Sequence, residues 1–395
     1  MTGTIYLDHN STTPIDPSVA QSIAECHSAG YVNPASQHRM GQLARRKLEQ
    51  SRQTIADILG AKCTGMETDQ LILTSGGTES NNLAILGLVE ASQNANKLSG
   101  RPPGRVLISA IEHPSIFGAA QHLAGLGYDV QKIPVDQNGV CQIDALKSLI
   151  QKPTELVSMM LANNETGTIQ PVAQAAKICR RHGIIFHTDA VQAVGKIPVH
   201  FGSLGVDALT FTAHKFNGPR AIGGLLLRHG VLPRPILFGG FQQMGIRPGT
   251  EDVALAVGMC RALELFKENP NRLRAMEELR NQLQNQLQSR FMDVTVNGGE
   301  AERVPQTLNI SFPGIDRQSF LMAADLAGLA ISTGSACASG SSELSPVLLA
   351  MGLEKEVVEG SIRISLGVST TPAEIAESVE RITKIICNIR TRVNG

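Results

Sequence analysis

The chain has 395 residues, and its 35 lysine and arginine side chains balance its 35 aspartate and glutamate side chains. A chain of this length exceeds the size at which one hydrophobic core keeps growing, so we expect about two domains. The balanced charge leaves no basic face for nucleic acid or an anionic membrane, and no apolar run is long enough to cross a bilayer. Because the N-terminus also lacks the pattern of a secretory signal, we expect a cytoplasmic protein whose partners are small molecules or other proteins.

Short apolar strands alternate with amphipathic helices along the first 264 residues. Strands are expected at 70–74, 105–109, 129–133, 156–161, 184–188, 208–212 and 223–227. Helices are expected after residue 16, at 42–59, from residue 79, at 115–126 and at 172–182. This alternation is typical of an α/β fold in which helices cover both faces of a mainly parallel sheet.

The pattern changes near Asn269-Pro270. A strongly charged helix is expected at 272–291, strands at 293–296, 307–312, 330–332 and 361–366, and a last helix after residue 372. We therefore predict a large α/β domain over 16–264. Residues 1–15 together with 265–395 are predicted to form a smaller α+β domain.

Lys215 lies in the polar turn that follows the apolar run ending at Thr212. Asp189, 26 residues earlier, ends another run of the same kind. A lysine amine at a strand end can form a Schiff base with a carbonyl, and an aspartate can keep a pyridinium nitrogen protonated. Pyridoxal 5'-phosphate requires both functions, so this pair predicts it as the cofactor.

The turn Ser75-Gly76-Gly77-Thr78, between an expected strand and an expected helix, is a candidate phosphate site. Two glycines let backbone N–H groups approach an anion, the helix N-terminus adds positive potential, and the Thr78 hydroxyl can donate. The alternative is an ordinary turn capped by Thr78. The turn is not a P-loop, because no Lys-Ser or Lys-Thr follows at the required spacing.

Two further polar groups follow expected strands, where ligands collect in open α/β sheets. His113 is placed to stack on a planar ring or to move a proton, or else to cap a helix beside Pro114. Asn164 is placed to donate to a ring hydroxyl, or else to stabilise its own turn. Each signal is weak alone, and their convergence at successive strand ends is what indicates a site.

The seven cysteines are widely scattered and include no Cys-x-x-Cys pair, so we expect neither a disulfide framework nor a metal site. Cys337 differs from the others because the surrounding segment 331–342 consists almost entirely of Gly, Ala, Ser and Thr. A thiol on such a loop can enter a cavity, act as a nucleophile and leave with the group that it acquired. An exposed cysteine without function is the alternative.

Taken together, the motifs resemble those of group I cysteine desulfurases, the NifS/IscS-like, fold-type I pyridoxal phosphate enzymes of the class V aminotransferase family. The resemblance covers nearly the whole chain. It rests on Leu7-Asp8-His9-Asn10-Ser11-Thr12-Thr13-Pro14, Asn33-Pro34-Ala35-Ser36-Gln37-His38, Ser75-Gly76-Gly77-Thr78-Glu79-Ser80-Asn81, Glu112-His113-Pro114, Asn163-Asn164-Glu165, Asp189-Ala190-Val191-Gln192, Ala213-His214-Lys215, Gly334-Ser335-Ala336-Cys337 and Ser361-Ile362-Arg363.

The resemblance implies a cofactor site in which Lys215 carries the cofactor and shuttles a proton while Asp189 pairs with the pyridine nitrogen. His113 would stack on the ring. The cofactor-binding residues that it implies are Gly77, Thr78, His113, Asn164, Asp189, Gln192, Thr212, His214, Lys215 and Thr250, with Asn164 and Gln192 at the ring oxygen. Thr250 would reach the phosphate of the neighbouring subunit, which implies a homodimer.

The resemblance also implies the reaction. L-Cysteine would bind with its carboxylate on Arg363, assisted by Asn33, because a planar guanidinium binds carboxylate bidentately. Lys215 would remove the Cα proton, and the Cys337 thiolate, with His113 as its candidate base, would attack the substrate sulfur. The products would be L-alanine and a persulfide on Cys337, which passes its sulfur to an acceptor such as an iron–sulfur scaffold protein.

Three alternatives remain open at this point: a selenocysteine lyase, an aminotransferase of the same fold, and a non-catalytic sulfur-assembly scaffold. The chain also departs from the family pattern at Gln242-Gln243-Met244-Gly245, where many relatives have Gln-Glu-Arg-Gly. Its C-terminus lacks the extended tail with which housekeeping members bind a scaffold protein. The sequence therefore leaves the sulfur acceptor undefined.

Overall fold

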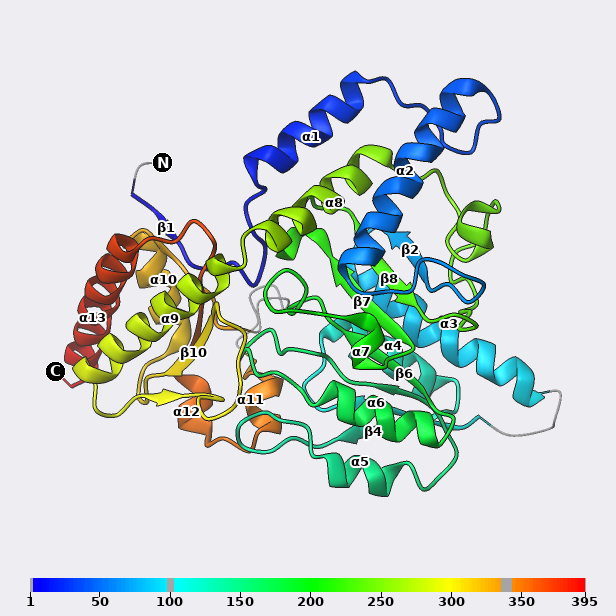
Figure 1. The fold of residues 1–395 in the computed structure, drawn as a ribbon. Coiled ribbons are helices and arrows are strands. Elements are labelled where there is room, and N and C mark those ends of the chain that lie inside the picture. The colour runs from blue at the N-terminus through cyan, green and yellow to red at the C-terminus, as the bar shows by residue number, and fades with distance from the viewer. Residues whose placement is uncertain (1–2, 98–102, 335–342, 395) are drawn as a thin grey trace.

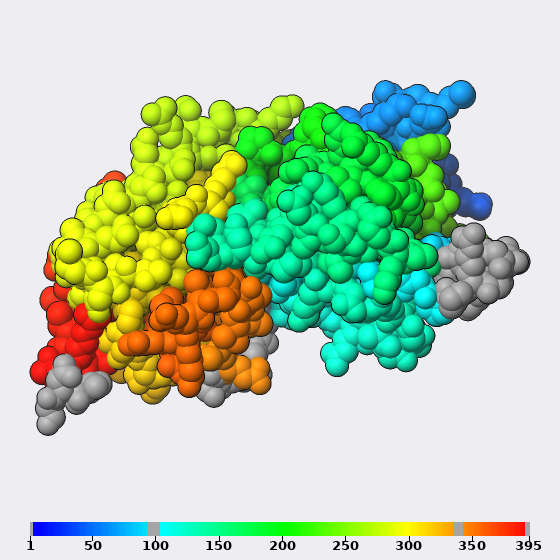
Figure 2. Space-filling model, turned by 90° about the horizontal axis from the view of Figure 1, so that it is seen from below, coloured from blue at the N-terminus to red at the C-terminus, as the bar shows by residue number. Residues whose placement is uncertain are grey.

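The computed structural model describes residues 3–97, 103–334 and 343–394. The chain forms two lobes, with the middle of the sequence in one and the C-terminal part in the other (Figure 1). Seen from below, the yellow to red residues of the C-terminal lobe lie beside the green and cyan residues of the larger lobe (Figure 2). Among the described residues, no helix is both long and apolar enough to cross a membrane.

The larger lobe contains a seven-stranded sheet. Its strands, in spatial order, are β2 (Gln70–Thr74), β8 (Gly223–Leu227), β7 (Ala208–Thr212), β6 (Ile185–Asp189), β5 (Thr154–Ser158), β3 (Arg105–Ser109) and β4 (Asp129–Ile133). Only β8 is antiparallel to its neighbours, β2 and β7. The connection from β7 to β8 spans residues 213–222, which is too short for a parallel crossover. The mainly parallel sheet is thus confirmed, with one reversed strand.

Alternate residues along the strands face two different hydrophobic cores. In β2, Leu71 and Leu73 pack into one core cluster, whereas Ile72 packs into another. The same alternation occurs in β8, where Leu226 and Leu225 belong to different clusters. Because successive side chains of a strand point to opposite faces, helices must cover both faces of this sheet.

The helices of this lobe largely match the predicted ones. They are α1 (Pro17–Ser28), α2 (Arg39–Ile58), α3 (Gly77–Lys97), α4 (Pro114–Gly125), α5 (Ile143–Leu149), α6 (Val172–Arg181), α7 (Phe201–Leu204) and α8 (Val253–Glu268). Asp16 begins α1 by accepting a hydrogen bond from the Ser18 backbone N–H at 2.9 Å, ahead of Pro17 in the first turn. Helices α5, α7 and α8 were not among the predicted ranges. For α5 and α7, fewer than two helical turns give little periodicity to detect.

Two predicted strands end at different residues from those expected. Strand 156–161 is observed as β5 at Thr154–Ser158, and strand 184–188 is observed one residue later as β6. Beyond β5 the chain still runs beside β6, since the Met159 and Leu161 N–H groups donate to the carbonyls of His187 and Asp189. These shifts are the size of the usual ambiguity at element ends.

The C-terminal lobe has its own antiparallel sheet and core. Strand β10 (Thr307–Ser311) lies between β12 (Ser361–Ser365) and the two-residue β9 (Thr295–Val296). Its helices are α9 (Asn271–Arg290), α10 (Arg317–Leu326), α11 (Pro346–Ala350), α12 (Lys355–Glu359) and α13 (Pro372–Asn394). The strand expected at 330–332 is observed as β11 (Leu329–Ala330), and Ser332 instead forms an isolated bridge with Arg363.

The N-terminal segment joins this C-terminal lobe before it enters the larger one. Strand β1 (Ile5–Tyr6) pairs in parallel with β11, and Ile5 and Leu7 are buried in the core cluster of the C-terminal lobe. The chain then reaches the end of β7, where the Thr13 N–H donates to the His214 carbonyl at 2.9 Å. This path brings residues 8–13 to the carboxyl edge of the large sheet, between the two lobes.

Candidate active site

A cavity of about 340 Å³ opens at the carboxyl edge of the large sheet. Ten of the predicted site residues line it, namely Gly77, Thr78, His113, Asn164, Asp189, Gln192, Thr212, His214, Lys215 and Arg363. A depression of about 420 Å³ between α2, β2 and residues 243–244 is larger but includes none of the predicted residues. The chemistry of the lining, and not the volume, therefore identifies the site.

Lys215 ends the short 3-10 helix η1 (Ala213–Lys215), which directly follows β7. Its Nζ donates hydrogen bonds to the backbone carbonyls of Asn10 at 2.6 Å and Ser11 at 2.8 Å. The lysine therefore lies at the sheet edge because it directly follows β7, and two carbonyls of the N-terminal segment accept hydrogen bonds from its amine. Sequence reasoning predicted the lysine but not these two carbonyl partners.

Asp189 is the last residue of β6 and is only 4% exposed. Its carboxylate accepts hydrogen bonds from Asn81 Nδ2 at 2.7 Å and from the Val191 N–H at 2.9 Å. Among the described residues it forms no ion pair, although a buried carboxylate is costly without a nearby cation. A protonated ring nitrogen in the cavity would supply that cation, so this residue fits the predicted cofactor.

Gly77 opens α3 beside the cavity, as the predicted phosphate site requires. A Cβ at this position would lie 3.1 Å from Val191 Cγ2 and 3.6 Å from Thr212 Cγ2, so only glycine leaves this space open. The first N–H groups of a 21-residue helix point toward an anion placed here. The turn at Gly77, where α3 begins, therefore fits a phosphate group, with Thr78 beside it.

His113 lines the cavity and also caps α4. Its Nδ1 lies 2.7 Å from Ser115 Oγ and accepts from the Ser115 N–H at 3.2 Å. Burial lowers the pKa of His113, the charge of Lys215 acts in the same direction, and Asp189 opposes them. His113 is therefore neutral near pH 7, as a base must be. The capping and catalytic readings of this residue are compatible.

His214 is held beside the N-terminal segment, with Nδ1 3.2 Å from Thr12 Oγ1. Burial lowers its pKa to about 4, and the positive charges of Lys215, Lys196 and Arg220 add to the effect. A neutral imidazole can donate one N–H to a phosphate oxygen without adding charge. Its position agrees with the phosphate role that the family resemblance implies.

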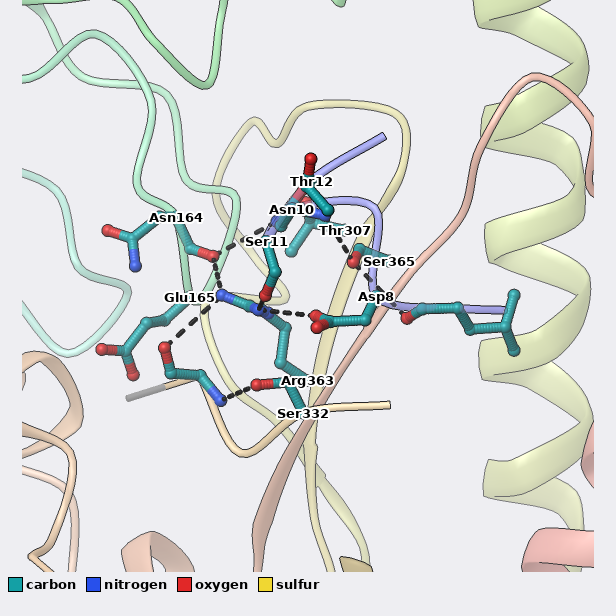
Figure 3. A network of polar contacts seen from close by, with 12 residues as sticks. Asp8, Asn10, Ser11, Thr12, Asn164, Glu165, Thr307, Ser332, Arg363 and Ser365 are labelled. Carbon is teal, nitrogen blue, oxygen red and sulfur yellow. Dashed lines mark hydrogen bonds and ion pairs between the residues drawn. The ribbon is translucent and has the colours of Figure 1, made fainter. Parts of the chain in front are cut away.

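Arg363, in β12, lies at the centre of a polar network beside the cavity (Figure 3). Its Nη2 donates to Asp8 Oδ1 at 2.7 Å and Ser11 Oγ at 2.8 Å, and its Nη1 donates to the Asn164 carbonyl at 3.0 Å and the Gly334 carbonyl at 3.4 Å. The side chain is 3% exposed, and in the described part of the chain its Nε has no hydrogen-bond partner. The guanidinium is thus oriented by Asp8 and retains donor capacity for an anion.

Three of the predicted site residues are not among those that line this cavity. Asn33 and Thr250 line a separate depression of about 260 Å³, beside the start of α8. Cys337 lies outside the described residues, but Gly334, the last residue before that segment, lines the cavity. The cavity of one chain therefore does not contain Asn33 or Thr250.

Sequence reasoning assigned no role to several residues that the structure brings to the site. Asn10, Ser11 and Asn81 line the cavity, and the buried Lys196 contacts Gln192 directly behind it. Asn10 and Asn81 stood within motifs that carried the family resemblance, which was the only available signal. The contacts of Asn10 with Asn164 and of Asn81 with Asp189 join positions more than 100 residues apart, which local periodicity cannot reveal.

Glu112 is a buried carboxyl group directly before His113. Its Oε1 accepts hydrogen bonds from Ser109 Oγ at 2.7 Å and the Met160 N–H at 2.8 Å. Burial raises the pKa of Glu112 to about 8, and the charge of Asp189 acts in the same direction. Glu112 is consequently protonated at neutral pH.

This raised pKa predicts how stability depends on pH. The unfolded chain releases the Glu112 proton near pH 4.5, whereas the folded chain keeps it up to about pH 8, so stability should fall as the pH rises between these values. The slope is at most on the order of 1 kcal/mol per pH unit. Urea unfolding at pH 5, 6.5 and 8 should show that Glu112→Gln removes this slope, whereas Glu356→Gln on the exposed face of α12 keeps it. An unchanged slope in Glu112→Gln would contradict the assignment.

Comparisons with known proteins agree with this geometry. The Aminotransferase class-V family matches residues 5–377. A cysteine desulfurase IscS of Dictyoglomus turgidum is 39% identical over 388 residues, covering 98% of this chain and 95% of that protein. A cysteine desulfurase of a Nostoc species is 37% identical over 387 residues, covering 98% and 94%. The solved structure of a NifS-like protein from Rickettsia africae matches with a TM-score of 0.86 at 32% identity, covering 97% of this chain and 99% of that one.

The chain therefore belongs to the class-V aminotransferase family, in its NifS/IscS-like group. Enzymes of this family depend on pyridoxal phosphate, so the predicted cofactor is confirmed at the level of the family. The predicted fold type is also confirmed, because the matching solved structures are NifS-like fold-type I enzymes.

Proposed function

We propose that the cavity around Lys215 and Asp189 is the active site of a pyridoxal phosphate-dependent cysteine desulfurase, which converts L-cysteine to L-alanine and a persulfide on Cys337. The observation that carries this proposal is the convergence of an amine, a buried carboxylate and a guanidinium, from Lys215, Asp189 and Arg363, in one cavity. The curated relatives support it, because they are named cysteine desulfurases and align over 94% or more of their own length. The chain is an enzyme of this group.

Each residue of the site has its own role in the proposed reaction. When bound, pyridoxal phosphate supplies an electron sink that stabilises negative charge at Cα of an amino acid. Asp189 keeps that sink effective by holding a proton at the ring nitrogen. Gly77, Thr78 and His214 bind the phosphate. Lys215, held by two backbone carbonyls, is the base that takes the Cα proton.

Sulfur transfer requires a thiol nucleophile, and none of the described residues that line the cavity is a cysteine. The Cys337 thiolate would form an S–S bond with the substrate sulfur as the C–S bond breaks, and the carbon would keep the electron pair and take a proton to give alanine. His113, neutral and lining the cavity, is the candidate to accept the thiol proton. Gly334, three residues before Cys337, also lines the cavity, which supports access of this thiol to the substrate.

The direct test is to mix the holoenzyme with L-cysteine and a reductant and to measure sulfide and alanine together. A desulfurase releases the two products in equal amounts. An aminotransferase would not form sulfide and alanine in equal amounts, and a non-catalytic scaffold would form neither product. A selenocysteine lyase would turn over selenocysteine but discriminate against cysteine. Unequal amounts of sulfide and alanine would refute the proposed reaction.

Arg363 is proposed to bind the substrate carboxylate. Replacing it with lysine keeps the charge but removes the planar pair of donors, so the KM for L-cysteine should rise about 10- to 100-fold. kcat should change less, because the carboxylate is bound alike in the ground and transition states. Steady-state kinetics measure both constants, with Arg290→Lys on the outer surface of α9 as the control. A lower kcat at constant KM would argue against this role.

We also propose a homodimer in which Thr250 reaches the partner's site. Thr250 lies outside the cavity of its own chain, and nearby Phe238 and Phe241 are 89% and 95% exposed. Aromatic side chains this exposed are typical of an interface. Phe241→Glu should weaken the dimer of 42.1 kDa chains by about 10- to 100-fold, measured by sedimentation equilibrium. A wild-type chain that sediments as a monomer would refute the dimer.

Two further assignments complete the proposal. We propose domains of 16–264 and of 1–15 with 265–395, because Ile5 and Leu7 share a core with helix α9 and the strands that follow it.

We also propose a cytoplasmic enzyme that passes sulfur to an acceptor protein such as an iron–sulfur scaffold. The name IscS of curated relatives supports this kind of acceptor.

A further inference from the structure

Lys196 is a buried lysine behind the cavity that none of the proposed roles uses. It lies four residues after Gln192 in a turn of helical type, in which the Lys196 N–H donates to the Ala193 carbonyl at 3.0 Å. This spacing places the two side chains on the same side of the turn. Lys196 is 5% exposed, and its Nζ donates to Gln192 Oε1 at 2.6 Å and to Asn10 Oδ1 at 3.3 Å.

The surrounding contacts allow only one orientation of the Asn10 and Gln192 amides. Asn10 Nδ2 donates to the Asn164 carbonyl at 3.2 Å and to Thr307 Oγ1 at 2.8 Å, so Asn10 Oδ1 faces Lys196. Gln192 Nε2 donates to the Asn10 carbonyl at 3.0 Å, so Gln192 Oε1 faces Lys196 as well. Turning the Gln192 amide over would set two acceptors against each other at Asn10 and two donors against each other at Lys196.

This orientation decides what Gln192 offers to the cavity that it lines. Its oxygen is used by Lys196, whereas Nε2 carries a second hydrogen beyond the one given to Asn10. We propose that Lys196 is a positioning residue, which holds the Gln192 amide so that Nε2 donates to the ring oxygen of pyridoxal phosphate. The inference rests on the proposed contact between Gln192 and that oxygen. It assigns to Lys196 an effect on the cofactor that it does not touch.

The proposal does not depend on the charge of Lys196. Burial lowers the pKa of Lys196 well below its ordinary value, and the charges of Lys215 and Arg363 act in the same direction. Behind Lys196, a depression is lined by the further charged residues Arg274, Glu277, Arg280, Glu302 and Arg303. Because a neutral amine still has two N–H bonds, Lys196 can donate to both oxygens in either protonation state.

The experiment follows the pH midpoint of the visible absorption band of the bound cofactor. A hydrogen bond to the deprotonated ring oxygen lowers its pKa, so Lys196→Met, which removes both donors, should raise the midpoint by about one pH unit. The dissociation constant of the cofactor should rise about tenfold. Lys196→Gln, which retains an N–H donor, should restore most of both values. If Lys196 acted only on protein stability, Lys196→Met would change neither the pH midpoint nor the dissociation constant of the cofactor.

The matched control is Gln306→Met. Gln306 Nε2 donates to Asn10 Oδ1 at 3.2 Å from a buried position, but within the described part of the chain no hydrogen bond joins it to Gln192. Its removal should lower stability in the same region and leave the midpoint unchanged. A midpoint shift in Gln306→Met equal to that in Lys196→Met would show a general disturbance of the site and overturn the inference.

Gln192→Met separates this inference from the proposed function. It should shift the midpoint as Lys196→Met does, and the double variant should add no further shift. If Gln192→Met leaves the midpoint unchanged, the contact with the ring oxygen is wrong and the inference falls with it. If Gln192→Met shifts the midpoint but Lys196→Met does not, Lys196 does not position Gln192. If Lys196→Met does not fold, Lys196→Gln tests the inference. A shift of the pH midpoint by about one unit in Lys196→Gln would show that the charge of Lys196 acts on the cofactor, and it would overturn the inference.

Discussion

Replacing Lys215 with alanine is expected to lower alanine formation from L-cysteine by at least about a thousandfold. The amine is both the group that carries the cofactor and the base at Cα, and removing a positioned base alone costs about 100- to 10,000-fold. No other described lysine lines the cavity. Single-turnover assays and the visible absorption spectrum measure the loss, and the band that the lysine gives to the bound cofactor should disappear with it.

The Lys215→Ala variant should still fold. It loses two hydrogen bonds to the carbonyls of Asn10 and Ser11, a change of about 1–3 kcal/mol in the free energy of unfolding. Lys147→Ala is the control, since Lys147 is 53% exposed on α5 and forms a local ion pair with Asp144, three residues earlier. More than a tenth of wild-type activity in Lys215→Ala, with cofactor still bound, would contradict the role of this lysine.

Replacing Cys337 with alanine is the second change with a very large expected effect. Without the thiol, nothing in the proposed mechanism can take the sulfur, so sulfide release should fall below about one hundredth of the wild-type rate. The cofactor band should remain, because no cofactor-binding residue is changed. Sulfide release and the visible spectrum, measured on the same sample, separate sulfur transfer from cofactor binding.

Cys387→Ala is the matched control for this variant. Cys387 is exposed near the end of α13 and does not line the cavity. Its removal should leave both sulfide release and the spectrum unchanged. If Cys337→Ala keeps wild-type sulfide release, the persulfide step is wrong, and a lyase that releases sulfide without this thiol becomes the better description.

The sheet and its site-bearing turns could be predicted because each has a local signal. The strand ending at Thr212 is a buried apolar run, and the polar turn after it cannot extend a strand, so Lys215 was expected at the sheet edge, where it lies. Asp189 ends β6, and His113 and Gly77 follow β3 and β2. Parallel strands bring their carboxyl ends to one edge, which is why four separate turns converged on one cavity.

Contacts between distant parts of the chain had no such signal. The Arg363 guanidinium is oriented by Asp8, 355 residues earlier, through a path that runs from β1 in the C-terminal lobe to the end of β7. The reversal of β8 depended on the length of one connection, which hydrophobic periodicity does not report. Lys196 looked like an ordinary lysine after a glycine, and only its burial against Gln192 indicates a role.

The sequence by itself therefore determined the candidates for the chemistry: a lysine, an aspartate, a glycine turn and a cysteine in an unusual segment, each indicated by its neighbours in the chain. Only the tertiary structure decided how those residues are held. It placed the Asn10 and Ser11 carbonyls on Lys215, Asp8 on Arg363 and Lys196 behind Gln192, and it put Asn33 and Thr250 outside the cavity of their own chain. The physical reason is that strand and turn formation depends on adjacent residues, whereas the bonds that Lys215, Arg363 and Lys196 donate to the N-terminal segment form only after distant parts of the chain have packed around one cavity.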